Sequence, residues 1–173
     1  MKNSLIRIGV SACLNGEKVR YDGDHRRNHF VAETLAGLFE LVPVCPESEL
    51  GMGIPRETVD LHGSIDAPRM IGTHGHKDWT DAMNAWALKR IQGLAALNLC
   101  GFVFKKGSPS CGVRNVPLIQ TDGEPLLEGR GLFVMAFTKT FPEIPIEDEL
   151  KLEDSEVQKD FIRKVYARHA AIS

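Results

Sequence analysis

The chain has 173 residues, of which 43% are hydrophobic and 25% are charged, and its net charge at pH 7 is -2. These values are typical of one folded domain with a sizeable core and exclude a disordered chain. The small net charge excludes a broad basic surface for nucleic acid, and no segment approaches the roughly 20 apolar residues that cross a membrane. The apolar run in residues 1–8 is too short for a signal peptide, so we expect the cytoplasm, where thiols stay reduced.

The hydrophobic pattern predicts strands and helices that alternate along the chain. In chain order they are a strand at 5–11, a helix at 29–39, a strand at 40–44, strand-like pieces near 58–61 and 69–71, a long helix after Asp78, a strand at 101–104, a meander or loop at 114–129, a helix at 132–137 and a final helix from Ser155. Strand, helix, strand, helix, strand is the order of a parallel α/β sheet. We therefore predict a single domain over residues 1–173 with a three-layer, Rossmann-like open sheet, mainly parallel, and helices on both faces.

Local signals mark the starts of three helices. Asp78 is suited to cap the long helix, and Ser155-Glu-Val-Gln158 has the pattern of a capping box. Gly129-Arg-Gly131 precedes the helix at 132–137. A glycine-rich turn before a helix can bind an anion, but two glycines are a weak signal and an ordinary turn is the preferred interpretation.

Three of the four cysteines stand where a predicted strand ends in a turn, namely Cys13, Cys45 and Cys111. Carboxyl ends of parallel strands meet at one edge of the sheet, and open α/β sheets build their sites there. The three thiols are therefore predicted to converge on a metal or a cluster. Three ligands would leave one coordination position open for chemistry. Cys100 lies in an apolar setting and is predicted to be a small core residue.

The spacing of these cysteines is 32 residues and then 66 residues. Zinc fingers use closely paired cysteines and ferredoxins use a tight run, so spacing alone leaves buried structural cysteines open as an interpretation. The Pro and Gly neighbours of the cysteines favour a site, because such residues permit a close approach of the backbone to a bulky group. His74-Gly-His76 is a weaker, competing candidate for zinc.

Carboxylates and hydroxyls stand beside two of the thiols. Glu47 and Glu49 follow Cys45, while Ser108 and Ser110 precede Cys111. A carboxylate near an open metal position can act as a general base on water, and a hydroxyl can donate to developing charge or relay a proton. For either glutamate, a solvated loop carboxylate is the alternative interpretation.

Three segments resemble the motifs of the DUF523 family, in order and at fitting separations over almost the whole chain. They are Val10-Ser-Ala-Cys13-Leu-Asn-Gly16 with Val19-Arg-Tyr-Asp-Gly23, Pro43-Val-Cys45-Pro-Glu47 with Pro55-Arg56-Glu57, and Lys105-Lys-Gly-Ser108-Pro-Ser-Cys111-Gly112. Many relatives have a Lys-Ser-Lys-Ser run before the proline of the third motif, where this chain has Lys105-Lys-Gly-Ser108. This departure affects the packing of the loop more than its chemistry.

The resemblance implies a thiouracil desulfurase with a [4Fe-4S] cluster held by Cys13, Cys45 and Cys111. A fourth iron, free of protein ligands, would bind the substrate sulfur, and 2-thiouracil or 4-thiouracil would yield uracil and sulfide without a redox step. Glu49 or Glu47 would deprotonate water. Ser108, or else Ser110, would relay a proton. The expected partners are a small thiolated nucleobase and water, and neither a membrane nor a nucleic acid.

Two other classes of protein stay open. A tRNA or nucleoside sulfur transferase would use the cluster in the thiolating direction, but the chain has no Gly-x-x-x-x-Gly-Lys-Ser/Thr or Ser-Gly-Gly-x-Asp-Ser run for ATP. A non-catalytic metal- or cluster-binding protein would need no acid beside its ligands, and the two glutamates near Cys45 argue against it. Loss of turnover in a Glu→Gln variant that retains the cluster would separate an enzyme from a binding protein.

Overall fold

The main sheet is open and entirely parallel. The computed structural model describes residues 5–173, so the expectation about the first residues lies partly outside it. The strands lie in the order β2 (Glu40–Val44), β1 (Arg7–Ser11), β5 (Phe102–Phe104) and β8 (Ile146–Asp148). The predicted parallel sheet is confirmed. Because the chain runs from β1 to β2 on one side and β5 adds on the other, the direction of the strand order reverses at β1, where such sheets bind ligands.

Helices cover both faces of this sheet, as predicted. Helices α3 (Thr80–Ala95) and α4 (Leu132–Thr140) pack on one face, while η2 (Phe30–Leu35), α1 (Ala36–Leu38) and α5 (Ser155–Ile172) pack on the other. The first of these cores is aromatic: the rings of Phe102 and Phe104 stack with centroids 4.0 Å apart, and Phe137 of α4 meets both rings edge-on. This contact holds α4, and the loop before it, against β5.

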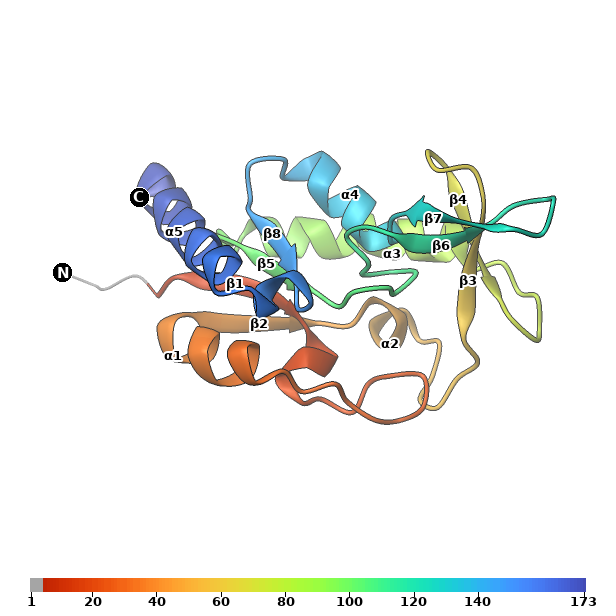
Figure 1. Ribbon diagram of the computed structural model, residues 1–173, viewed down its shortest axis with the longest axis horizontal. Helices are drawn as coiled ribbons and strands as arrows, with labels where there is room; N and C mark the ends of the chain where they lie inside the picture. The colour runs from red at the N-terminus through yellow and green to blue at the C-terminus, as the bar shows by residue number, and fades with distance from the viewer. Residues whose placement is uncertain (1–4) are drawn as a thin grey trace.

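A second sheet lies at the end of the molecule opposite helix α5 (Figure 1). Its strands lie in the order β4 (Pro68–Gly72), β3 (Val59–Gly63), β6 (Val116–Ile119) and β7 (Pro125–Gly129), and only the β3–β6 pair is parallel. The strand-like pieces near 58–61 and 69–71 and the meander at 114–129 are thus confirmed. Their union into one sheet was not predicted, since it depends on the pairing of Leu61 with the distant Leu118.

Two local predictions need correction. Helix α5 is capped by Asp154, whose Oδ1 accepts from the Glu156 backbone N–H at 2.8 Å, so Ser155 is not the capping residue. Strand β8 was missed because its sequence is acidic; Arg114 Nη1 pairs with Glu147 at 2.8 Å and with Asp148 at 2.6 Å. A short 3-10 turn, η3 (Lys151–Glu153), follows this strand. No helix within residues 5–173 is long and apolar enough to cross a membrane.

Candidate functional site

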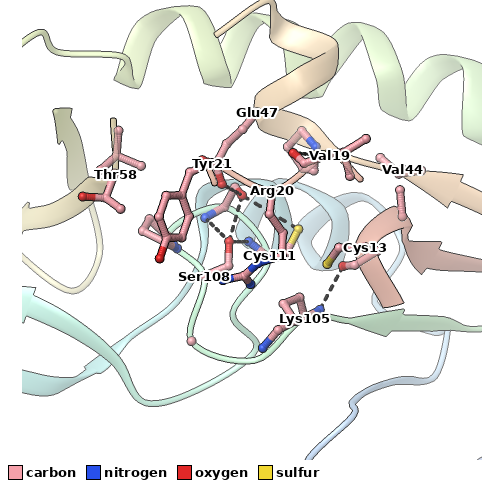
Figure 2. Close-up of a pocket in the computed structure, with 18 of the residues that line it drawn as sticks. Cys13, Val19, Arg20, Tyr21, Val44, Glu47, Thr58, Lys105, Ser108 and Cys111 are labelled. Atoms are coloured by element: carbon pink, nitrogen blue, oxygen red, sulfur yellow. Dashed lines mark hydrogen bonds between the residues drawn. The ribbon is translucent and has the colours of Figure 1, made fainter. Parts of the chain in front are cut away.

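A cavity of about 240 Å³ lies at the carboxyl ends of the parallel strands. Cys13, Cys45 and Cys111 all line it, so the predicted convergence of the three cysteines is observed. Figure 2 shows the sulfur atoms of Cys13 and Cys111 facing the same space. Thr58 and the start of β3 contribute to the opposite wall, so both sheets shape the cavity. The fourth cysteine, Cys100, is buried elsewhere in the apolar core, as predicted.

Cys13 lies in a 3-10 turn, η1 (Ala12–Asn15), directly after β1. The turn ends at Gly16, whose positive φ of 94° lets the chain reverse there, and the Cys13 carbonyl accepts from the Arg26 backbone N–H at 2.9 Å. Burial raises the pKa of the Cys13 thiol to about 11, and the nearby cations Lys105 and Arg20 oppose that rise. The thiol is therefore protonated at neutral pH unless a metal replaces the proton.

Cys45 occupies the N-cap position of a short helix, α2 (Pro46–Leu50), which begins where β2 ends. Pro46 occupies the first turn, where its missing N–H is tolerated. The Cys45 backbone N–H donates to Glu49 Oε2 at 2.8 Å, and the Cys45 thiol donates to the Val19 carbonyl at 3.8 Å. The cysteine is thus held from both its backbone and its side chain.

Cys111 lies in the loop between β5 and β6, which is folded around one hydroxyl. Ser108 Oγ accepts from the backbone N–H groups of Ser110 at 3.2 Å and of Cys111 at 3.1 Å. Gly131 packs so closely that an added Cβ would lie 2.4 Å from the Ser110 carbonyl oxygen. Burial raises the pKa of the Cys111 thiol above its usual range, while a hydrogen bond from Ser11 opposes the rise.

The two candidate glutamates on α2 have different surroundings. Glu47 lines the cavity; its Oε2 accepts from the Ser110 hydroxyl at 2.9 Å and its Oε1 accepts from Arg56 Nε at 3.3 Å. Glu49 does not line the cavity; one of its oxygens accepts from the Cys45 backbone N–H and the other accepts from Arg90 Nε at 2.9 Å. Only Glu47 therefore faces the thiols.

The two candidate serines form a hydrogen-bonded chain that ends on Glu47. Ser108 Oγ lies 3.0 Å from Ser110 Oγ, and Ser110 Oγ is also 3.8 Å from the Cys111 sulfur. Both serines line the cavity, where Ser110 is 1% exposed and Ser108, labelled in Figure 2, is half-buried. Such a chain can carry a proton between the cavity and the carboxylate.

Charged residues that the sequence analysis did not select also line the cavity. Lys105 forms an ion pair with Glu149 at 2.7 Å, and Arg56 forms one with Glu47. Arg20 Nε is buried and has no hydrogen-bond partner among the described residues. Arg20 lies in the loop after η1 and Arg56 in the segment before β3, so their place in the motifs quoted above was the signal that could have identified them.

The cavity fits a group larger than one metal ion. Within residues 5–173, there is no group of three or more His, Cys, Asp or Glu side chains placed to bind a single metal ion. His74 and His76, the alternative zinc ligands, therefore form no such group among these residues. The three thiols nevertheless share one cavity with the cations Arg20 and Lys105. Soft thiolates suit an iron–sulfur cluster, and the cations would offset its negative charge. Arg20 Nε, which lies 3.6 Å from Asp22 Oδ1 but makes no hydrogen bond within the described part of the chain, would then have an acceptor.

Comparisons with known proteins gave a family, a relative and a solved structure that this chain resembles. The sequence model of the family described as 2-thiouracil desulfurase matches residues 8–149. The protein YbbK of Bacillus subtilis is 30% identical over 110 residues, which is 61% of this chain and 72% of YbbK. The solved structure of a [4Fe-4S]-dependent thiouracil desulfidase, TudS, is similar with a TM-score of 0.66 and 26% identity, over 90% of this chain and 98% of that chain.

Proposed function

Because this chain belongs to the 2-thiouracil desulfurase family, we propose that its cavity converts a thiolated uracil and water into uracil and hydrogen sulfide. Similarity to a [4Fe-4S]-dependent desulfidase supports that cluster as the cofactor. A cluster held by Cys13, Cys45 and Cys111 would supply an iron without a protein ligand, a Lewis acid that favours soft sulfur. The observation that carries the proposal is the convergence of these thiols with Glu47 in one cavity.

Glu47 is the proposed acceptor of the proton from water. The reaction replaces a C=S bond with C=O and consumes one water, so two protons must reach the departing sulfur while no electrons are exchanged. Glu47 has the required carboxylate in the cavity, and Arg56 keeps that carboxylate paired. Glu49, the alternative from the sequence, is occupied by the Cys45 backbone and by Arg90, which argues for a structural role.

Ser110 and Ser108 are the proposed path for the proton. Ser110 donates to Glu47 and lies beside Ser108, so a proton accepted by Glu47 can pass through two hydroxyls toward the cavity. Ser108 also accepts two backbone N–H groups, which ties its hydroxyl to the shape of the loop. Ser110 is therefore the more direct relay, and Ser108 both holds the loop and extends the path.

The first experiment is anaerobic reconstitution with iron and sulfide, followed by measurement of sulfide and uracil from 2-thiouracil and 4-thiouracil. We expect a brown protein that releases one sulfide for each uracil formed. Cys13→Ala should abolish release together with the cluster absorbance. A fully loaded protein that is inert toward both bases would overturn the substrate assignment, and a colourless protein with bound zinc would overturn the cofactor. ATP-dependent loss of free uracil into a thiolated product would favour the transferase instead.

The proposed function also involves a location in the cell, a single domain and small partners. Reduced thiols suit the cytoplasm that the sequence leads us to expect, where they stay available to a cluster. Walls from both sheets favour treating the two sheets as one domain, since neither sheet would enclose the cavity alone. The proposed partners are a small thiolated base and water.

A further inference from the structure

Arg56 has an unusual set of contacts for a charged side chain. Its side chain is 6% exposed, and each arm of the guanidinium is engaged: Nε donates to Glu47 Oε1 at 3.3 Å, Nη1 to the Gly53 carbonyl at 2.9 Å and Nη2 to the Val19 carbonyl at 3.0 Å. Its backbone N–H donates to the Tyr21 carbonyl at 2.9 Å. A buried guanidinium with every arm engaged is held in one orientation.

These contacts connect separate parts of the cavity wall. Val19 and Tyr21 belong to the loop after Cys13, Glu47 belongs to α2, and Gly53 belongs to the segment that leads to β3. The Val19 carbonyl also accepts from the Cys45 thiol. Arg56 and the Cys45 thiol therefore share one acceptor, which ties the arginine to the wall beside Cys45.

A second pair of a glutamate from α2 with an arginine makes the comparison direct. Glu49 forms an ion pair with Arg90 at 2.9 Å, with side chains 33% and 26% exposed, and neither residue lines the cavity. The pair of Glu47 and Arg56 is more buried, at 14% and 6%, and does line it. Both pairs join a glutamate of α2 to an arginine, but only the pair of Glu47 and Arg56 faces the thiols.

We propose that Arg56 is a positioning residue for desulfuration: it fixes the orientation of Glu47 and holds the Val19 wall beside Cys45. By occupying Oε1, it leaves Oε2 directed to Ser110. This inference rests on the proposed role of Glu47. A lysine would keep the charge but could not reach Glu47, Gly53 and Val19 together, because an ammonium lacks the planar fork of the guanidinium.

The test compares Arg56→Lys and Arg56→Ala with the matched variants Arg90→Lys and Arg90→Ala. For each protein we would measure iron per chain, melting temperature, and kcat and KM for thiouracil, with kcat divided by cluster content. We expect both Arg56 variants to retain most of their cluster and to lose about 100-fold in kcat per cluster, with KM changed only a few-fold. Both Arg90 variants should keep kcat within about three-fold of the unmodified protein.

Chemical rescue and a double variant separate positioning from a structural role. Methylguanidinium added to Arg56→Ala should restore about ten-fold in kcat, and Arg56→Ala should add little to the loss already caused by Glu47→Gln. Normal kcat per cluster in Arg56→Lys would overturn the proposal, as would full additivity with Glu47→Gln. If Arg56→Ala does not fold, the Arg56→Lys comparison decides the matter. An unmodified, fully loaded protein without turnover would instead reject the proposed function, so the two failures are distinguishable.

Discussion

The Ser110 hydroxyl donates to Glu47 Oε2 at 2.9 Å and thereby joins a loop to helix α2 across 63 positions of the sequence. Each of the two segments also carries a cysteine of the cavity, Cys45 at the start of α2 and Cys111 next to Ser110. The bond therefore links the acid–base groups of the two segments that carry these cysteines. The predictions that follow test the separate contributions of these groups.

Glu47→Gln should lower kcat per cluster by about 100- to 10,000-fold, because an amide cannot accept the proton of water. Glu49→Gln should lower it by no more than a few-fold, since its side-chain oxygen can still accept from the Cys45 backbone. Sulfide release from reconstituted protein, normalised to iron content, is the measurement. Loss of turnover in Glu49→Gln with retention in Glu47→Gln would transfer the role of base to Glu49.

The two serines should give different phenotypes. Ser108→Ala removes the acceptor of two backbone N–H groups, which should cost about 1–3 kcal/mol in stability and lower cluster content. Ser110→Ala leaves the loop bonds intact and should mainly reduce kcat. Thermal unfolding and iron content, measured beside turnover, would distinguish them; equal losses in all three quantities for both variants would contradict this division.

Replacement of any one of Cys13, Cys45 and Cys111 by alanine should remove the broad visible absorbance of the cluster and reduce bound iron. Cys100→Ala is the matched control, since Cys100 is buried in the core and does not line the cavity. It should keep the cluster and lose only the stability of one small core contact. Full iron content in Cys45→Ala would show that Cys45 is not a ligand.

Gly131→Ala should destabilise the loop that carries Cys111, because its Cβ would lie within 2.7 Å of backbone atoms of Ser110 and Cys111. Backbone cannot move aside as a flexible side chain can, so we expect a lower melting temperature and less bound iron. Gly93→Ala is the control in helix α3, where a Cβ would meet only Arg90 at 4.0 Å. That change should stabilise the protein by about 0.5–1 kcal/mol. A neutral Gly131→Ala variant would contradict the close packing.

Asp78 should contribute stability that depends on pH. Hydrogen bonds from Thr80 hold the pKa of the Asp78 carboxyl down to about 2, with a further contribution from Arg69. A lowered pKa stabilises the fold above the unfolded-state value of about 4, and this stability is lost as the pH falls from there through about 2. Because the Asp78 side chain is 39% exposed and solvent screens its charge, Asp78→Asn should lower the melting temperature at pH 7 by only about 2–4 °C, a loss of about 1 kcal/mol.

The loss of stability caused by Asp78→Asn should become progressively smaller as the pH falls below about 4. Asp81→Asn is the control. The Asp81 side chain is 91% exposed and its ion pair with the same arginine is long, at 3.6 Å, so the substitution should have little effect on stability at any pH. A constant difference between the unmodified protein and Asp78→Asn from pH 7 to pH 2.5 would contradict the predicted linkage.

The parallel sheet and the cysteine edge could be predicted because their signals are local. Each strand of the first half is a short apolar run that ends in a turn, and Cys13 and Cys45 follow such runs directly. The rule that parallel strands share one carboxyl edge then brings these cysteines together. Strand β8 could not be found in this way, because Glu147 and Asp148 look solvated until Arg114 is placed against them.

The details of the site depended on long-range contacts. Glu47 and Glu49 are equivalent in the sequence, both close after Cys45, and they differ only because one meets Ser110 and Arg56 and the other meets Arg90. Gly131, the second glycine of Gly129-Arg-Gly131, likewise packs against the Cys111 loop, which no local pattern indicates. Helical and strand periodicity report which face is buried, but not which partner it meets.

The wide separation of the three cysteines also bears on how the protein is made. The ribosome adds Cys111 66 residues after Cys45, and β8, which borders β5, follows later still. Until Cys111 has been made, the growing chain offers two of the thiols without the third, and until β8 has been made the parallel sheet is unfinished. The complete set of three thiols is therefore available to a cofactor only in the later part of synthesis.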